Sequence, residues 1–275
     1  MIAFDFDYYR PTSLEQAYDI YKQLNADNEI PVYFAGGTEL ISMARVNSRE
    51  FKAVIDLKGV PECNQFGMEN GKLIIGSALT LTQIAVSKVF PLLSDTVTRI
   101  ADHTIQGKIT LGGNLAGTIK YREASLPLMI SQCTATIMTE NGLVQVPFLD
   151  CFNGHLLLKE NEYLVAVGID EDEIGLPYQH VKRTKMDKID YPLITIAATK
   201  RENTALRAAI TGYGDKPLIL PAETLSDTSV TIPDRIKSLI QKLRQDNIAD
   251  LSGSKEYKEF VLENILVQMF KNFKD

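Results

Sequence analysis

The chain has 275 residues, of which 45% are hydrophobic and 23% are charged, and its formal net charge is −6. This length is sufficient for two domains. Because nucleic-acid binding usually needs a basic face, the acidic charge argues against a nucleic-acid partner. The first residues lack the pattern of a signal peptide, and no apolar run approaches the roughly 20 residues of a membrane helix. We therefore expect a cytoplasmic protein that does not use a membrane.

The cysteines limit the possible redox centres. Cys63, Cys133 and Cys151 are far apart in the chain, odd in number and form no CxxC pair. This spacing disfavours a disulfide framework, a zinc ribbon and an iron–sulfur cluster. The histidines show no metal-ligand spacing either, so we expect no metal site. Any redox cofactor would be held by groups other than thiolates.

The first half of the chain predicts a mixture of strands and helices. A capping-box pattern at 12–15, followed by apolar residues at helical spacing, predicts a helix over 12–25. An Asn-Gly pair within 134–149 predicts a β-hairpin. Further β-rich runs and helical patterns predict strands at 32–35, 53–57 and 73–75, and helices at 82–87, 92–101 and 127–131.

The character of the sequence changes after an apolar strand predicted at 163–169. An acidic run at 170–173 is interpreted as a solvated connector. In the basic run at 182–188, Arg183, Lys185 and Lys188 are expected in solvent or in contact with a partner subunit. We place a domain boundary near residue 170. Beyond it we expect strands at 193–200 and 205–213 joined by a turn at 202–203, and helices at about 233–245 and 254–272. One stripe of the last helix is expected to face the core or another subunit: Tyr257, Phe260, Val261, Ile265, Met269 and Phe273.

Two glycine segments are the most specific feature of the sequence. Residues 35–40 read AGGTEL and residues 110–115 read TLGGNL, each after an apolar or β-branched stretch. Adjacent glycines allow positive φ and let backbone amides approach a ligand closely. A single segment of this kind is more often a simple turn, but two can grip one extended anion. The P-loop, Rossmann and GxSxG motifs are absent, which disfavours other nucleotide sites and hydrolases.

These segments resemble the loops of a known flavoprotein family. Residues 32–40 and 109–115 are similar to the FAD-binding subunit of molybdenum hydroxylases, which include xanthine, carbon monoxide and nicotinate dehydrogenases. The opening segment 6–17 and the segment 251–258 resemble the two ends of that subunit. The resemblance implies an α+β fold with a two-part FAD-binding domain of the vanillyl-alcohol-oxidase-like (PCMH-type) superfamily. This domain would span 1–169, in parts of about 1–57 and 58–169, before a C-terminal flavoprotein domain at 170–275 with a three-stranded antiparallel sheet.

The resemblance also implies cofactor-binding residues. The first loop would wrap the FAD pyrophosphate with its amides, and the second would approach the phosphates and ribityl chain from the other side. Glu123 would accept hydrogen bonds from cofactor hydroxyls, and Lys182 would place a cation near the pyrophosphate or flavin; a surface carboxylate and a solvated basic run are the alternatives. Ile100 and Leu164 match positions near the cofactor, with core roles equally open. The full implied set is Val32, Tyr33, Phe34, Ala35, Gly36, Gly37, Thr38, Glu39, Ile100, Thr110, Leu111, Gly112, Gly113, Asn114, Glu123, Leu164 and Lys182.

The resemblance implies one subunit of a larger enzyme, without catalytic acid–base residues of its own, because the flavin performs the chemistry. Non-covalent FAD would receive electrons from the [2Fe-2S] clusters of a small subunit, served by a molybdopterin-binding large subunit. NAD⁺ or another acceptor would take them. Two alternatives stay open: a stand-alone flavin-dependent oxidase or dehydrogenase of the same fold, and a cofactor-free scaffolding module. The intact glycines speak against the scaffold.

Overall fold

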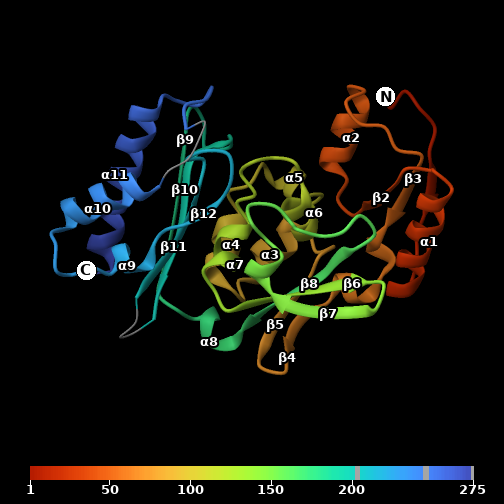
Figure 1. Ribbon diagram of the computed structural model, residues 1–275, viewed down its shortest axis with the longest axis horizontal. Helices are drawn as coiled ribbons and strands as arrows, with labels where there is room; N and C mark the ends of the chain where they lie inside the picture. Colours follow the sequence, from red (N-terminus) through yellow and green to blue (C-terminus); the bar gives the residue numbers. More distant parts are fainter. Residues whose placement is uncertain (202–204, 244–247, 274–275) are drawn as a thin grey trace.

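The computed structural model describes residues 1–201, 205–243 and 248–273. Three sheets are arranged in a row, with the N-terminal sheet at one end and the C-terminal sheet at the other (Figure 1). Both the turn predicted at 202–203 and the last two residues of the helix predicted at 233–245 lie outside the described residues. No helix among the described residues is long and apolar enough to cross a membrane.

The N-terminal sheet is parallel and has the order β1-β3-β2. Its strands and the two helices beside it are β1 (Asp7–Tyr9), α1 (Leu14–Ala26), β2 (Pro31–Phe34), α2 (Thr38–Arg45) and β3 (Ala53–Asp56). The predicted first helix is present, but its cap is Ser13 rather than Thr12. The Ser13 side chain accepts a hydrogen bond from the Gln16 amide, while the Gln16 side chain accepts one from the Thr12 amide.

The central sheet is antiparallel, with the order β4-β5-β8-β6-β7. Its strands are β4 (Phe66–Glu69), β5 (Lys72–Gly76), β6 (Cys133–Thr139), β7 (Gly142–Pro147) and β8 (Tyr163–Asp170). The β6–β7 hairpin turns at Asn141-Gly142, as the sequence predicts, and Gly142 has φ +90°. Short 3₁₀ helices flank this sheet: η1 (Leu57–Gly59), η2 (Pro61–Asn64) and η3 (Phe148–Asp150).

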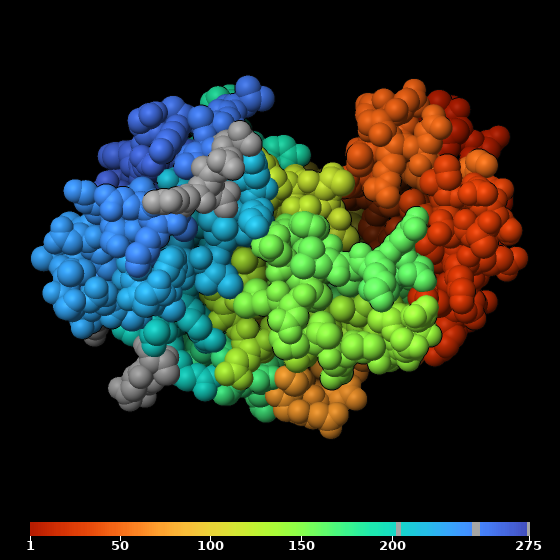
Figure 2. Space-filling view, in the orientation of Figure 1, coloured from red at the N-terminus to blue at the C-terminus, as the bar shows by residue number. Residues whose placement is uncertain are grey.

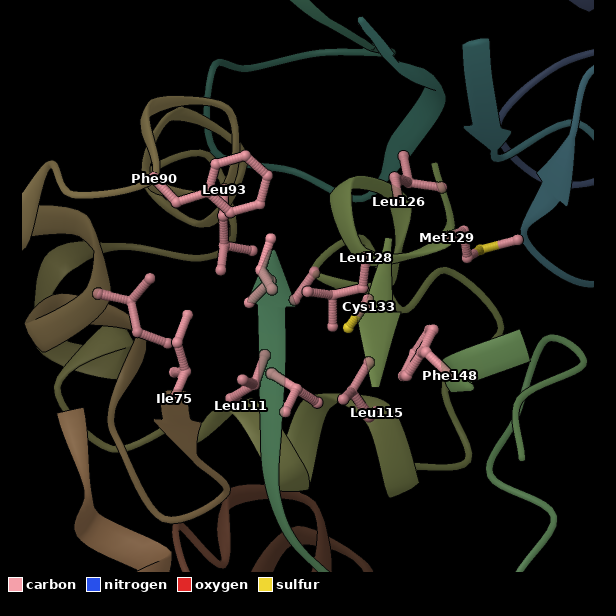
Figure 3. Packing of buried hydrophobic residues seen from close by; sticks show 14 of the residues in the cluster. Ile75, Phe90, Leu93, Leu111, Leu115, Leu126, Leu128, Met129, Cys133 and Phe148 are labelled. Carbon is pink, nitrogen blue, oxygen red and sulfur yellow. The ribbon is translucent and has the colours of Figure 1, made fainter. Parts of the chain in front are cut away.

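Five short helices lie between β5 and β6 in the chain, and all but the third supply residues to the largest hydrophobic cluster of the described residues. They are α3 (Leu81–Ser87), α4 (Pro91–Val97), α5 (His103–Gln106), α6 (Leu111–Ala116) and α7 (Ser125–Met129). Figure 3 shows Ile75 of β5, Leu93 of α4, Leu111 of α6 and Leu128 of α7 meeting in this cluster. Helix α6, which starts within the second glycine segment, is therefore anchored through its apolar side chains.

The C-terminal sheet is antiparallel, with the order β12-β11-β10-β9. Its strands are β9 (Tyr178–Thr184), β10 (Pro192–Lys200), β11 (Leu206–Thr211) and β12 (Leu218–Ile219), so two residues add a fourth strand to the three expected. The helices of this part are α8 (Glu171–Ile174), α9 (Ala222–Leu225), α10 (Ile232–Lys242) and α11 (Lys255–Asn272). Part of the sequence interpreted as a solvated basic run is β9.

Alternation along β10 explains how this sheet joins two layers. Ile194 and Ile196 belong to the hydrophobic cluster that includes α10 and α11, whereas Ala197 belongs to the central cluster. Successive residues of a strand point to opposite faces. One face of β10 therefore packs against the C-terminal helices, and the other packs against the central lobe, which consists of the central sheet and helices α3 to α7. The C-terminal sheet is thus packed against the central lobe.

The interpretation of the acidic run was wrong in part, and the stripe predicted on α11 faces the core only in part, with Ile265 and Met269 buried. The acidic run is not solvated throughout: Glu173 is buried and pairs with Arg207 at 2.6 Å. On α11, Tyr257 and Phe260 are 50% and 61% exposed, whereas Lys258 is fully buried. Lys258 occupies the core face because its Nζ atom pairs with Asp250 at 2.9 Å and donates to the Gly212 carbonyl. Because Lys258 occupies the buried face of α11, the sequence does not show a continuous hydrophobic pattern along that face.

A buried ion pair connects the central lobe to the C-terminal sheet. Lys182 Nζ lies 2.9 Å from Glu123 Oε2, and the two side chains are 1% and 6% exposed. Lys182 also donates to the Arg99 carbonyl at 2.8 Å, and Thr195 donates to Glu123 Oε1 at 2.8 Å. These hydrogen bonds satisfy both charges at the junction, as buried charges require.

Removal of one partner should expose the structural role of this pair. Lys182→Met leaves the buried Glu123 carboxylate unpaired, so we expect a loss of about 3–5 kcal/mol of unfolding free energy. The double variant Glu123→Gln/Lys182→Met should lose less, since no buried charge then lacks its partner. Urea denaturation followed by circular dichroism measures both, with the exposed Lys188→Met as control. Equal stability of Lys182→Met and Lys188→Met would refute this role.

Candidate functional site

The two glycine segments lie side by side. A Cβ atom on Gly36 would fall 2.0 Å from the carbonyl oxygen of Lys108 and 3.2 Å from the amide of Thr110, so no larger residue fits there. Farther along, the Glu39 carboxylate accepts hydrogen bonds from the amides of Thr118 at 2.7 Å and Ile119 at 3.3 Å. The start of α2 is therefore fastened to the chain on both sides of α6. Figure 2 shows the surface hollowed between the N-terminal lobe and the middle of the chain.

The first segment presents open backbone amides. Gly37 has φ +67° and is the N-cap of α2, and no side chain caps this helix. The first bond of the helix runs from the Ile41 amide to the Gly37 carbonyl, and no hydrogen bond among the described residues uses the amides of residues 36–40 as donors. A left-handed residue before a helix N-terminus makes a concave group of amides that favours an anion. This geometry suits a phosphate group.

Contacts beneath the first segment keep it in shape. The ring of Phe34 lies under Gly37, where a Cβ atom would be 2.0 Å from the ring. Lys58 Nζ lies 4.7 Å from the centre of the same ring and donates to the Ala35 carbonyl at 2.6 Å and to Asp56 at 2.8 Å. Because these contacts use side chains and carbonyls, they leave the amides available.

The second segment differs from the first, because its amides are already used. Thr110 caps α6: its side chain accepts from the Gly113 amide at 3.2 Å, and its carbonyl accepts from the Asn114 amide at 2.9 Å. The amides of Leu111 and Gly112 donate to the carbonyls of Leu79 and Ser77. The sequence-based expectation of two amide cradles is therefore met only by the first segment. The second offers polar side chains and the bare surface of Gly113, which is exposed.

Several of the residues predicted to bind a cofactor have side chains that lie in the hydrophobic core. Tyr33 lies between Tyr21 and Tyr163, with ring centroids 4.6 Å away in both cases, and its hydroxyl donates to the Asn161 carbonyl. The other members of this group belong to hydrophobic clusters: Val32, Ile100, Leu111 and Leu164. Their side chains contribute to packing. A contact with a cofactor stays a prediction for them.

Glu123 and Lys182 are brought together, but they bind each other at the junction described above. Burial raises the pKa of the Glu123 carboxyl, and Lys182 and Thr195 oppose this rise by binding the ionised form. Both residues are buried, so the alternatives of a surface carboxylate and a solvated lysine are wrong. Their contact with a cofactor is not excluded by this pairing and stays a prediction.

Sequence analysis missed Arg122. This residue is 9% exposed and has φ +35°, which is uncommon for a residue with a side chain. Its Nε atom is buried and has no hydrogen-bond partner. The neighbouring Ala124 amide donates to Asn114 Oδ1 at 3.2 Å, so this stretch is attached to the second glycine segment. No motif marks Arg122, because its environment is created by residues distant in sequence.

Cys63, Cys133 and Cys151 are free and buried, and burial raises the pKa of Cys63 to about 12 and that of Cys151 to about 11. Within the described part of the chain, no group of three metal-ligating side chains comes together. The arrangement is suited to holding an anionic ligand.

Comparison with known proteins gives relatives of one kind. The xanthine dehydrogenase FAD-binding subunit of Escherichia coli O157:H7 is 26% identical over 279 residues, covering 95% of this chain and 93% of that protein. The caffeine dehydrogenase subunit beta of Pseudomonas sp. strain CBB1 is 26% identical, covering 78% of this chain and 75% of that protein. Similar solved structures include the carbon monoxide dehydrogenase of Hydrogenophaga pseudoflava, with a TM-score of 0.85 and 23% identity over 98% of this chain and 96% of that one.

The fold is shared with a further enzyme, quinoline 2-oxidoreductase from Pseudomonas putida 86. The TM-score is 0.81 at 22% identity, covering 96% of this chain and 94% of that one. At the level of sequence, the family described as the FAD binding domain in molybdopterin dehydrogenase matches residues 4–169, a stretch that contains both glycine segments. The chain therefore belongs to the family of FAD-binding domains of molybdopterin dehydrogenases.

Proposed function

We propose that this chain is the FAD-binding electron-transfer subunit of a molybdenum hydroxylase complex, with FAD held non-covalently between the two glycine segments. The observation that carries the proposal is the set of open amides at residues 36–40. They lie at the N-terminus of α2 beside the chain that leads into α6. FAD is anionic at its pyrophosphate, which is the chemistry that such amides bind.

The residues of the site fit this cofactor. The Glu39 carboxylate would repel a phosphate, but both of its oxygens accept hydrogen bonds from the amides of Thr118 and Ile119. Asn114 supplies a polar side chain on the opposite side, whereas Thr110 is buried and caps α6. A Cβ atom on Gly113 would meet only Thr110 Oγ1, at 2.9 Å. The exposed face of Gly113 therefore permits close approach of an extended ligand such as the ribityl chain.

The bound flavin supplies the capacity to accept and donate electrons. The protein's own contribution is to bind the anionic part, to orient the cofactor against the second segment and to hold the lobes together. The relatives carry names such as subunit beta and medium chain, which supports a place in a complex. We propose a molybdopterin-binding large subunit and a [2Fe-2S] small subunit as partners, and NAD⁺ or another molecule as the electron acceptor.

FAD binding can be measured directly on the purified chain. We expect FAD to bind, and acid treatment to release it intact, because the attachment is non-covalent. Gly113→Val should weaken FAD affinity by at least about tenfold, since a branched side chain occupies the exposed face that the cofactor approaches. Gly175→Val is the matched control, because a Cβ atom there meets open space. Equal FAD affinity in both variants would remove the second segment from the site, and a chain that takes up no FAD would overturn the proposal.

Membership of a complex can be tested by purification of the native assembly. We expect the chain to elute with polypeptides that carry molybdenum and the absorption spectrum of [2Fe-2S] clusters, in one size-exclusion peak. Metal analysis across the peak makes the measurement quantitative. A native protein that contains flavin but neither iron nor molybdenum would favour a stand-alone oxidase over the electron-transfer subunit.

A further inference from the structure

Arg122 is a buried cation whose side chain forms no hydrogen bond or ion pair with the described residues. Arg122 is only 9% exposed, and its buried Nε atom has no hydrogen-bond partner. Two other buried cations behave differently: Lys182 pairs with Glu123 and Lys258 pairs with Asp250. Because a buried charge normally needs a partner, the guanidinium of Arg122 differs from these two lysines.

The position of Arg122 relates it to both glycine segments. The chain before it is attached to Glu39 of α2 through the amides of Thr118 and Ile119. The chain after it is attached to the second segment through the bond from the Ala124 amide to Asn114. Burial lowers the pKa of the Arg122 guanidinium, and the field of the Glu39 carboxylate opposes this shift, so the two side chains are electrostatic neighbours.

Glu39 does not serve as the ion-pair partner, although it is near. Its oxygens are occupied by two backbone amides, and it forms no ion pair with Arg122 within the described residues. Arg122 also adopts φ +35°, a conformation that costs free energy in a residue with a side chain. A largely buried cation without a protein partner, on a strained backbone, is explained when a ligand supplies the missing charge.

The chemistry of the missing partner follows from the guanidinium and its surroundings. A planar guanidinium matches two oxygens of a phosphate and binds them more strongly than neutral donors do. The open amides of residues 36–40, which include the amide of Glu39, also favour a phosphate. An anionic phosphate group has the charge and the oxygen atoms that both sets of donors bind.

We infer that Arg122 determines affinity for the diphosphate part of the bound FAD, with its guanidinium paired to phosphate oxygens. This inference rests on the proposed function. It assigns to Arg122 the role of the cation in the site, because Lys182 is already paired at the junction between lobes.

The test compares Arg122→Gln with Arg45→Gln, which removes the same charge from the exposed end of α2. We measure FAD affinity by flavin fluorescence at low and at high salt, and the melting temperature of the cofactor-free proteins. Arg122→Gln should raise the FAD dissociation constant by about tenfold or more, since it removes a charge-assisted pair. Its affinity should also depend less on salt than that of the wild type. Arg45→Gln should match the wild type in both respects.

A merely structural arginine would behave differently. Since Arg122 has no protein partner to lose, the melting temperature of cofactor-free Arg122→Gln should equal or exceed that of the wild type. Arg122→Lys keeps the charge without the planar fork and should recover part of the lost affinity. Unchanged FAD affinity in Arg122→Gln, or a lower melting temperature that accounts for its loss, would overturn the inference. Failure of the wild type to bind FAD would instead overturn the proposed function.

Discussion

The absence of a side chain at Gly36 is the constraint on which the site depends. The Gly36 backbone lies against the Lys108 carbonyl so closely that a Cβ atom would overlap it. This contact brings the N-terminal lobe against the chain that leads into α6. It also fixes the direction of the backbone that follows Gly36. Gly37 then turns into α2 with φ +67°, and the amides after it have no protein acceptor among the described residues. Close packing at one residue thus leaves open backbone amides at its neighbours.

Three carboxylates hold the chain that follows the second glycine segment. Glu39 binds the amides of Thr118 and Ile119, Asp250 binds Lys120, and Glu123 binds Lys182. Burial alone would raise the pKa of Asp250, but hydrogen bonds from Lys120 and Lys258 hold it well below its usual range. Glu39 joins the N-terminal lobe to this stretch, whereas Asp250 and Lys182 both belong to the C-terminal part of the chain. The segment between α6 and α7 is consequently held to both of these parts, and Arg122 lies within it.

Sequence patterns predicted the features that depend on neighbouring residues. The β6–β7 hairpin follows from Asn141-Gly142, and the existence of α1 follows from its apolar spacing and polar cap. Charges were interpreted less well, because their partners are distant. Glu173 was expected in solvent and is buried against Arg207, which belongs to another strand. Lys258 sits on the core face of α11 only because Asp250 and the Gly212 carbonyl accept its hydrogen bonds. A local sequence pattern does not show which distant residue pairs with a buried charge.

The two glycine segments show why even a specific motif needs its environment. Both contain adjacent glycines, yet the amides of residues 111–114 are consumed by Thr110, Leu79 and Ser77, whereas those of residues 36–40 are open. The difference arises because Thr110 caps its own helix, while Gly37, at the same position before α2, has no side chain to do so. A capped helix start is complete in itself. An uncapped one, fixed in place from outside, leaves its amides open to water or to an anion.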